Sequence, residues 1–284
     1  MMRFTGYMIP LVAVLLLAGA GCNLPFVEPP ERDVLLETTS SLLFQKGTTL
    51  TLQGTVFGFG STVLDSVSRE TTRRFVTLTS FNSGRSLGLE WKMMVKSTEP
   101  DGAGEPVEVT GALATEHLES HNKLHLPAYW REGDEGVIEE SGILWLGREQ
   151  YVELTETGES ELRPGIFENL YRFLSFTEGM ADTLNRLQGE ADRAAEHTDI
   201  YKLIAEPGYG TYRLTLDGEK TWVRTVRASN WFGHYTILAN PENPLILEVV
   251  LNPLSTGAVG TLSNTKVLDA LFGYRVIDVT GTDR

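Results

Sequence analysis

Apolar and polar residues alternate along most of the chain after Thr48, a pattern typical of strands that bury one face. The clearest example runs from Leu87 to Val95, where every second residue is apolar and Gly88, Glu90 and Lys92 lie between them. The same alternation predicts further strands at 50–56, 75–81, 107–113, 212–216, 222–226, 235–239 and 245–251.

Turn sequences separate these strands. The pair Asp217-Gly218 lies between two alternating runs and predicts a tight hairpin. Residues 82–84, 101–102 and 240–244 are rich in Gly, Pro, Asn and Asp, which favour turns. Many short strands joined in this way predict a largely antiparallel sheet that curls or closes.

One segment, 166–197, follows helical spacing instead, because its apolar residues recur at intervals of three and four. We expect a long helix there, broken near 177–179, with its apolar stripe packed on the concave face of the sheet. The aromatic residues Phe167, Tyr171, Phe173 and Phe176 are expected in the core. The predicted fold class is therefore α+β and mainly β: a curved antiparallel sheet or half-barrel with one long helix.

Composition and charge narrow the choice of partners. The chain has 284 residues, of which 41% are hydrophobic, enough for a sizeable core. Its formal net charge is −14, and loss of residues 1–21, whose only charge is Arg3, makes this −15. Such a surface repels nucleic acid, so a nucleic-acid partner is not expected. The single cysteine, Cys22, excludes an internal disulfide and a cysteine-based metal cluster.

The first 22 residues have the layout of a secretory signal. Arg3 precedes an apolar run, and the small residues Gly19, Ala20 and Gly21 come directly before Cys22. The run from Met8 to Gly21 has 14 residues, fewer than the roughly 20 that a membrane-spanning helix needs. The alternatives at this point are a lipid anchor and a soluble secreted protein with an idle thiol.

This end resembles bacterial lipoprotein precursors, whose signal finishes in a lipobox of the form Leu, small, small, Cys. Ala20, Gly21 and Cys22 match that pattern, while Gly19 stands where a branched aliphatic residue is usual. The resemblance implies cleavage before Cys22 and attachment of a diacylglyceryl group, whose acyl chains include palmitate, to its thiol. It also implies a cell-envelope location, with the outer membrane favoured in a Gram-negative host because position 23 is Asn and not Asp.

The expected organisation has three parts. Residues 1–21 form the signal peptide, 22–47 the lipidated cysteine and an extended tether, and 48–284 a single β-rich domain with the helical insertion at 166–197. Pro25, Pro29 and Pro30 favour the extended tether because proline disfavours helix interiors and central strands.

Three of the five histidines, His117, His121 and His125, recur at intervals of four. This spacing aligns imidazoles on one face of a helix or of a strand, as a transition-metal site requires. The zinc-protease pattern His-Glu-x-x-His is absent, because the glutamate lies at Glu119 and not at position 118. A turn at 120–123 would place His121 at its tip, so exposed loop histidines are the competing interpretation.

Three functions follow. The first is a non-enzymatic lipoprotein that binds an apolar ligand or an envelope partner, with no cofactor. The second is a metal-assisted hydrolase that uses the three histidines with Glu116 or Glu119. The third is a structural subunit of an envelope complex, for which Trp130, Trp222 and Trp231 on exposed strand ends are suitable contact residues.

The expected arrangement is also similar to the LolA and LolB type of lipoprotein carrier, in which helices close a half-barrel of antiparallel strands. This similarity is architectural, extends over Thr48 to Val279, and involves no shared motif. It implies a sheltered apolar ligand and assigns no individual residue.

Overall fold

The computed structural model describes residues 31–55, 73–96, 106–127, 130, 132–139, 141–165, 189, 191–251 and 273–282. All of them belong to one compact unit that extends from Glu31 to Arg284. The predicted signal, with Gly19, Ala20, Gly21 and Cys22, lies outside the described residues. Among the described residues, no helix has the length and apolarity needed to cross a membrane.

Strands dominate the described residues, so the protein is a mainly β member of the α+β class, as predicted. Twelve strands form one sheet: β1 (Thr49–Thr55), β2 (Arg73–Asn82), β3 (Ser86–Lys96), β4 (Pro106–Glu116), β6 (Glu135–Val137), β8 (Glu159–Glu161), β9 (Lys202–Ala205), β10 (Gly210–Leu216), β11 (Glu219–Asn230), β12 (Gly233–Leu238), β13 (Ile246–Leu251) and β14 (Gly273–Thr280). A two-stranded sheet pairs β5 (Lys123–Leu124) with β7 (Ser141–Gly142), and the helices are α1 (Arg32–Ser40) and α2 (Arg148–Thr157).

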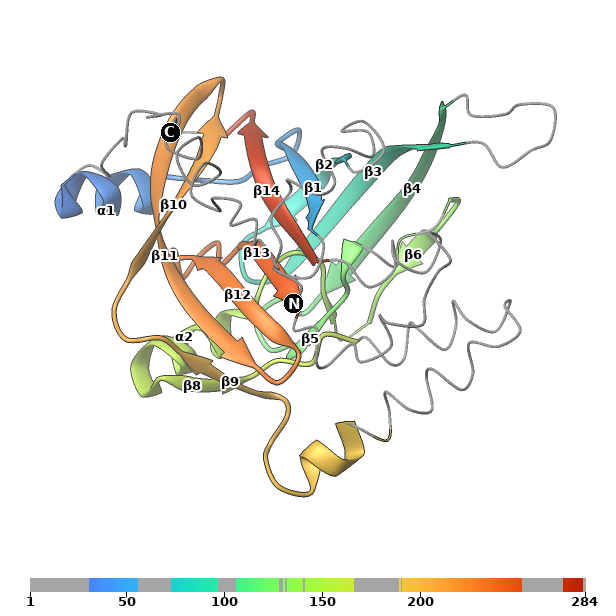
Figure 1. Ribbon diagram of the computed structural model, residues 1–284. Helices are drawn as coiled ribbons and strands as arrows, with labels where there is room; N and C mark the ends of the chain where they lie inside the picture. Colours follow the sequence, from blue (N-terminus) through green and yellow to red (C-terminus); the bar gives the residue numbers. More distant parts are fainter. Residues whose placement is uncertain are drawn as a thin grey trace, which may run out of the picture. The chain divides into compact units, whose positions relative to one another are not determined.

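The large sheet closes on itself in one half. Its order is β6-β4-β3-β2-β1-β14-β13-β12-β11-β9-β8, and β10 pairs with both β11 and β14. Strands β10 to β14 therefore form a closed five-stranded barrel, and β1 to β4 continue the sheet away from it. Figure 1 shows β1 to β4 to the right of β14 and the barrel strands to its left.

Strand β14 has two partners on the edge that faces the barrel. Its first half pairs with β13, through Tyr274 and Arg275, and its second half pairs with β10, through Asp278 and Val279. Its other edge pairs with β1 over the whole length, with one irregularity at Thr51/Leu52 that leaves Ile277 unpaired. Because β13 and β10 pair with different halves of β14, these two strands separate along it and leave an opening in the barrel wall.

The predicted strands are confirmed because their alternation matches burial. In β3, Leu87, Leu89 and Trp91 are buried, whereas Glu90 is exposed. Asp217 and Gly218 both have positive φ and join β10 to β11 in the predicted hairpin. The large sheet is not purely antiparallel, since β10 with β14 and β4 with β6 pair in parallel, and the separate β5–β7 sheet is parallel as well.

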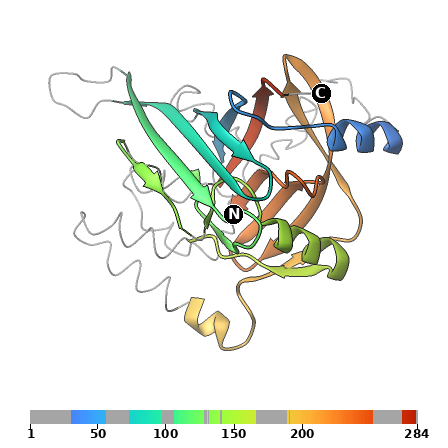
Figure 2. The same cartoon turned by 180° about the vertical axis from the view of Figure 1, so that it is seen from behind.

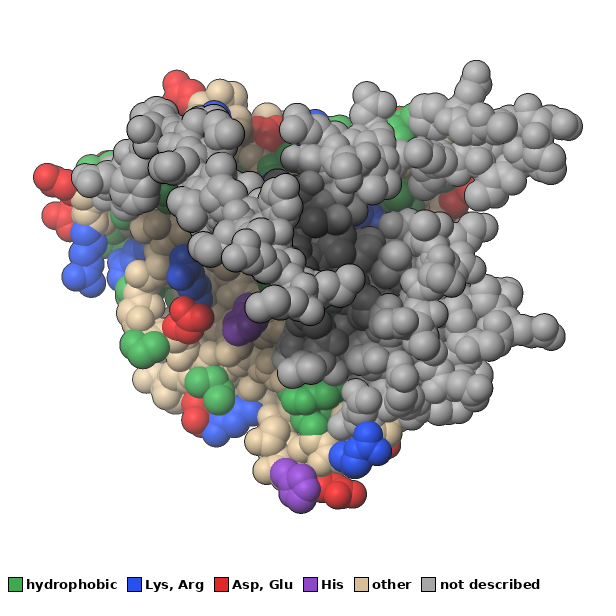
Figure 3. Space-filling view, viewed as in Figure 1, with side chains coloured by type: hydrophobic (Ala, Val, Ile, Leu, Met, Phe, Trp, Pro, Cys, Tyr) green, Lys and Arg blue, Asp and Glu red, His purple; other side chains and the backbone are tan. Residues whose placement is uncertain are grey.

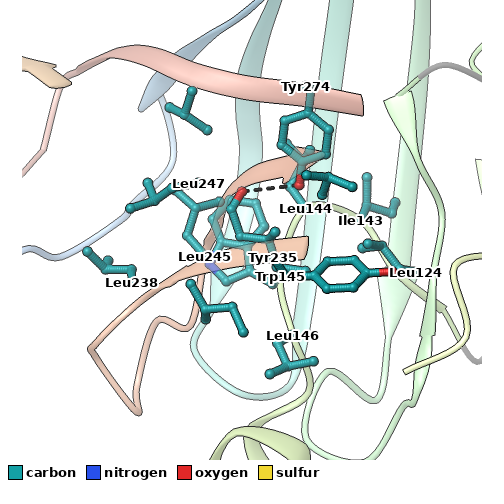
Figure 4. Packing of buried hydrophobic residues seen from close by; sticks show 14 of the residues in the cluster. Leu124, Ile143, Leu144, Trp145, Leu146, Tyr235, Leu238, Leu245, Leu247 and Tyr274 are labelled. Atoms are coloured by element: carbon teal, nitrogen blue, oxygen red, sulfur yellow. Dashed lines mark hydrogen bonds between the residues drawn. The ribbon is translucent and has the colours of Figure 1, made fainter. Parts of the chain in front are cut away.

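The segment between β7 and α2 fills part of the core. Ile143, Leu144, Trp145 and Leu146 are at most 2% exposed, and Ile246 N donates to Leu144 O at 2.7 Å. Their side chains gather with those of barrel strands, including Tyr235 and Tyr274 (Figure 4). We call residues 143–146 the core segment.

The tether predicted at 22–47 is wrong for its second half. Residues 32–40 form α1, which contacts β11, and Leu42 and Phe44 that follow are buried in the core. Thr39 Oγ1 accepts from Arg224 N at 2.8 Å and donates to Leu35 O at 2.6 Å. The folded unit therefore begins at Glu31 and not at Thr48, and α1 is part of it (Figure 2).

The helix predicted at 166–197 lies mostly outside the described residues. Its last part, 191–195, is helical, and Ala191 is buried in the core. The aromatic residues between Phe167 and Phe176 are not described.

Candidate functional site

The three predicted metal-ligating histidines lie in different environments. His117 is exposed, with a positive φ of 61°, whereas His121 is 5% exposed and His125 is half-buried. The part of the chain that the structure describes contains no group of three His, Cys, Asp or Glu residues placed to hold a metal ion. The regular spacing does not align the imidazoles, because residues 117–122 form a turn and a loop instead of a helix or strand.

His121 is buried and bonded to backbone, not placed at an exposed tip. Its Nε2 lies 3.2 Å from Trp145 O, and its Nδ1 lies 3.4 Å from His117 O. Burial lowers the pKa of the imidazole, and the contacts with the Trp145 and His117 carbonyls oppose that effect. A Cβ on Gly142 would overlap both His121 Nε2 and Trp145 O. His121 therefore fixes the turn after β4 against the core segment, which is a structural role.

The three tryptophans expected as contact residues are less exposed than predicted. Trp130 is 5% exposed and packs on Trp91, with ring centroids 5.7 Å apart. Trp222 and Trp231 are half-buried, and Trp231 packs against Phe232. Trp130 is thus a core residue, and the prediction that it lies on an exposed strand end is wrong.

A row of polar side chains crosses the sheet where the barrel and the flat region meet. Each member is the cross-strand partner of the next, from β11 across β12, β13, β14 and β1 to β2. The members, which we call the charged row, are Arg227, Thr236, Glu248, Arg275, Gln53 and Arg73. The row contains three arginines and one carboxylate, in a chain whose net charge is −14.

Glu248 is the centre of this row. Burial raises the pKa of its carboxyl group, while Arg275, a hydrogen bond with Thr236 and Arg227 act in the opposite direction. Arg275 Nη2 also donates to Gln53 Oε1 at 3.3 Å. Two guanidinium groups therefore lie near enough to a half-buried carboxylate to favour its charged form, an arrangement that is more frequent at functional sites than on ordinary surfaces.

A pocket of about 300 Å³ opens at the split in the barrel wall, and we call it the wall pocket. Its charged lining residues are Arg213, Lys220, Glu248 and Arg275. Its apolar lining comes from Tyr212, Leu214 and Ile277, and Thr215 completes it. The split between β10 and β13 along β14 thus brings the centre of the charged row to a cavity of ligand size.

Tyr212 forms part of the pocket wall. Its hydroxyl donates to Val276 O at 2.8 Å, and burial raises its pKa. Glu248 and Arg275 both lie close enough to influence that pKa, Glu248 upward and Arg275 downward. The phenol is consequently neutral near pH 7 and fixed by the backbone, so it shapes the pocket and does not titrate there.

Two larger pockets lie on either side of β6 and are acidic. One, of about 660 Å³, includes Glu90, Glu132 and Glu135, and the other, of about 570 Å³, includes Asp134, Glu135 and Glu139. Lys92 lines the first and Lys123 the second. On the face seen in Figure 3, charged side chains of both signs are interspersed with isolated hydrophobic ones. The wall pocket differs from the acidic pockets in its excess of cations.

No family model, curated protein or solved structure matches the chain. The function is therefore inferred from the sequence and from the arrangement of the described residues.

Sequence reasoning did not find the wall pocket. Glu248 lies in a strand that was predicted, but its partner Arg275 lies in β14, which was not. Residues 273–280 do alternate in part, since Tyr274 and Val276 are buried on either side of Arg275. That alternation was the available signal, although the pairing of β14 with β13, β10 and β1 leaves no mark in a single sequence.

Proposed function

We propose that this chain is a lipid-anchored protein of the bacterial cell envelope whose β-domain acts by binding a ligand or an envelope partner. The wall pocket is the observation that carries the binding part of the proposal. It combines a cavity of about 300 Å³ with a half-buried carboxylate whose charged form nearby arginines favour, in a domain with a filled core.

The anchoring part rests on residues 15–22 and on the resemblance of that stretch to a lipobox. Ten peptide units separate Cys22 from the first residue of α1, and they span at most about 35 Å when fully extended. Two or three acyl chains bind a membrane firmly, since each buried methylene contributes about 0.8 kcal/mol. A lipid on Cys22 would therefore hold the domain close to the membrane surface.

The filled core changes which kind of binding is favoured. The carrier hypothesis needs an apolar space between the sheet and what covers it, yet the core segment and strand residues such as Leu52, Val249 and Val276 are at most 2% exposed. Around these described residues, such packing has the density of a protein interior and leaves no room for a lipid chain. We therefore favour binding at the wall pocket over binding inside the sheet.

Labelling in bacterial cells tests the anchor. With an alkyne analogue of palmitate, we expect the wild-type chain to be labelled and to sediment with membranes, because Cys22 is the only thiol. The variant Cys22→Ser should lose both properties, whereas Gly19→Leu, which restores the usual lipobox residue, should retain or increase labelling. Equal labelling of wild type and Cys22→Ser would refute the proposal.

The membrane assignment has its own test. Replacement Asn23→Asp should move a labelled chain from outer-membrane to inner-membrane fractions of a Gram-negative host. If the wild-type chain already separates with the inner membrane, the outer-membrane assignment is wrong although the anchor stands.

A further inference from the structure

The wall pocket has more cations than its own carboxylate can neutralise. Arg213, Lys220 and Arg275 face a single lining carboxylate, Glu248. Of these, Arg275 and Glu248 lie opposite each other on adjacent strands, and Thr236 bonds the carboxylate from the other side. The deep part of the pocket is thus close to electrically balanced, and the excess positive charge lies toward the opening.

Arg213 and Lys220 supply that excess from the β10–β11 hairpin. Both are exposed, and they are the cross-strand partners of Trp222 and Thr215. Arg213 lies over the Trp222 ring, with its Cζ 5.8 Å from the centroid, which limits its freedom. Across the described residues, neither side chain forms an ion pair with a carboxylate.

Apart from Thr215, the rest of the lining is apolar. Leu214 is 3% exposed, and Ile277 lies at the irregularity where β14 changes register against β1. The Tyr212 hydroxyl is already bonded to Val276 O, so its ring offers a largely apolar surface to the pocket. A ligand would therefore meet apolar surface in one part of the pocket and cations in another.

We propose that the wall pocket binds a small amphiphile with an anionic head group, a carboxylate or a phosphate. The head group is held by Arg213 and Lys220 at the opening, and a short apolar body lies against Ile277 and the Tyr212 ring, which are both half-buried. Guanidinium and ammonium groups are the side chains that pair with carboxylate and phosphate oxygens. A volume of about 300 Å³ suits a single short alkyl chain and not a full lipid. The inference rests on the proposed binding function and names its ligand class.

Calorimetric titration of residues 22–284 carrying Cys22→Ser tests the inference without detergent, since this chain retains the whole unit from Glu31 onward. The probes are octanoate, octyl phosphate, inorganic phosphate and octylamine. We expect saturable binding of octanoate or octyl phosphate, much weaker binding of inorganic phosphate, and none of octylamine. Whichever of the first two binds more tightly identifies the head group.

Two variants test whether the ligand binds at the wall pocket. Lys220→Gln and Arg213→Gln should each weaken it by about three- to tenfold, since each removes one charge-assisted contact. The matched control Lys92→Gln removes an exposed cation from β3 and should leave binding unchanged. Circular dichroism of each variant verifies that the fold is retained.

Three results would overturn the inference: no saturable binding of either octyl anion, equal binding of octylamine, or equal weakening by all three variants. If inorganic phosphate binds as tightly as octyl phosphate, the apolar lining of the pocket contributes nothing to binding, and that part of the inference is wrong. Because the lipid anchor is absent from this experiment, these failures leave the anchoring proposal standing. Loss of palmitate labelling at Cys22, conversely, has no bearing on the titrations.

Discussion

Two ionisable side chains illustrate how position decides chemistry in this protein. His121 is buried and Glu248 is half-buried, and burial shifts the pKa of each toward its neutral form. The two ring nitrogens of His121 lie within hydrogen-bond distance of the His117 and Trp145 carbonyl oxygens, so this side chain contributes to stability. Glu248 lies at a pocket beside Arg275 and contributes to a site.

The stability of the domain should depend on His121 as pH falls. The folded state lowers the imidazole pKa below 6.5, so the unfolded state binds more protons once pH drops through that value. The contribution of His121 is therefore complete above pH 6.5 and declines below it. Nearby Glu119 favours the protonated ring and reduces the effect, but burial is the larger cause.

Urea unfolding of the wild type and of His121→Gln, from about pH 8 to about pH 5, measures this contribution. We expect the difference in unfolding free energy to shrink as pH falls through 6.5, because only the wild type loses stability by that route. Glu248 and Asp278, whose carboxyl pKa values are raised, titrate in both proteins, so their contribution largely cancels in the difference. A difference that stays constant with pH would contradict the structural role.

The pair formed by Glu248 and Arg275 gives a second test. Arg275→Met leaves the half-buried carboxylate without its main partner and should cost about 1–3 kcal/mol near pH 7. Burial raises the pKa of Glu248 above 4.5, so its favourable contribution is complete below 4.5 and declines as pH rises through the folded value. The cost of Arg275→Met should therefore be smaller near pH 4.5 than near pH 7.

A matched control for this pair is Lys92→Met, which breaks an exposed ion pair with Glu108 at 3.6 Å. It should cost less than about 1 kcal/mol, as exposed pairs do. Adding Glu248→Gln to Arg275→Met should recover part of the loss, since the uncompensated charge disappears. If the unfolding free energy lost by the double variant equals the sum of the losses of the two single variants, Glu248 and Arg275 do not interact.

Among the elements, those whose residues alternate were predictable and those defined by long-range pairing were not. β3 and the β10–β11 hairpin follow from apolar spacing and from Asp217-Gly218. α2 was missed, although Gly158 at its end has the left-handed conformation typical of a helix C-terminus. α1 was missed because the prolines before it suggested a tether, whereas its burial depends on β11, nearly 200 residues away.

Substitutions at two neighbouring residues of α1 test whether this helix is part of the folded unit. Leu35 is 7% exposed and Leu36 is 45% exposed. Leu35→Ala should cost about 2–3 kcal/mol of unfolding free energy, because it removes buried apolar volume. Leu36→Ala should change it by less than about 0.5 kcal/mol. Equal, small effects would restore the view that residues 32–40 belong to a tether.

For the molecule as a whole, the sequence predicted a mainly β sheet that curls or closes, but not which strands close it. Alternation shows which face of a strand is dry and says nothing of which strands meet. β10 meets β14 only after a separation of more than 60 residues, and this pairing both closes the barrel and creates the wall pocket. The histidine motif, by contrast, was visible in the sequence, but among the described residues its three imidazoles do not lie together, because spacing aligns side chains only inside a regular element.

The proposed protein has a lipid anchor at Cys22 and a binding domain with a filled core. Its two parts differ in what supports them: the anchor rests on the residues before Cys22, and the binding site rests on the geometry around Glu248. A domain held within about 35 Å of a membrane would meet amphiphiles that partition there. The anchor is thus the part on which the cellular role depends.

The mass of the N-terminal peptide of the protein purified from bacterial membranes tests this most directly. We predict a peptide that begins at Cys22 and carries a diacylglyceryl group, with or without a further acyl chain on its amino group. A peptide that begins elsewhere, or that begins at Cys22 with a free thiol, would contradict the account.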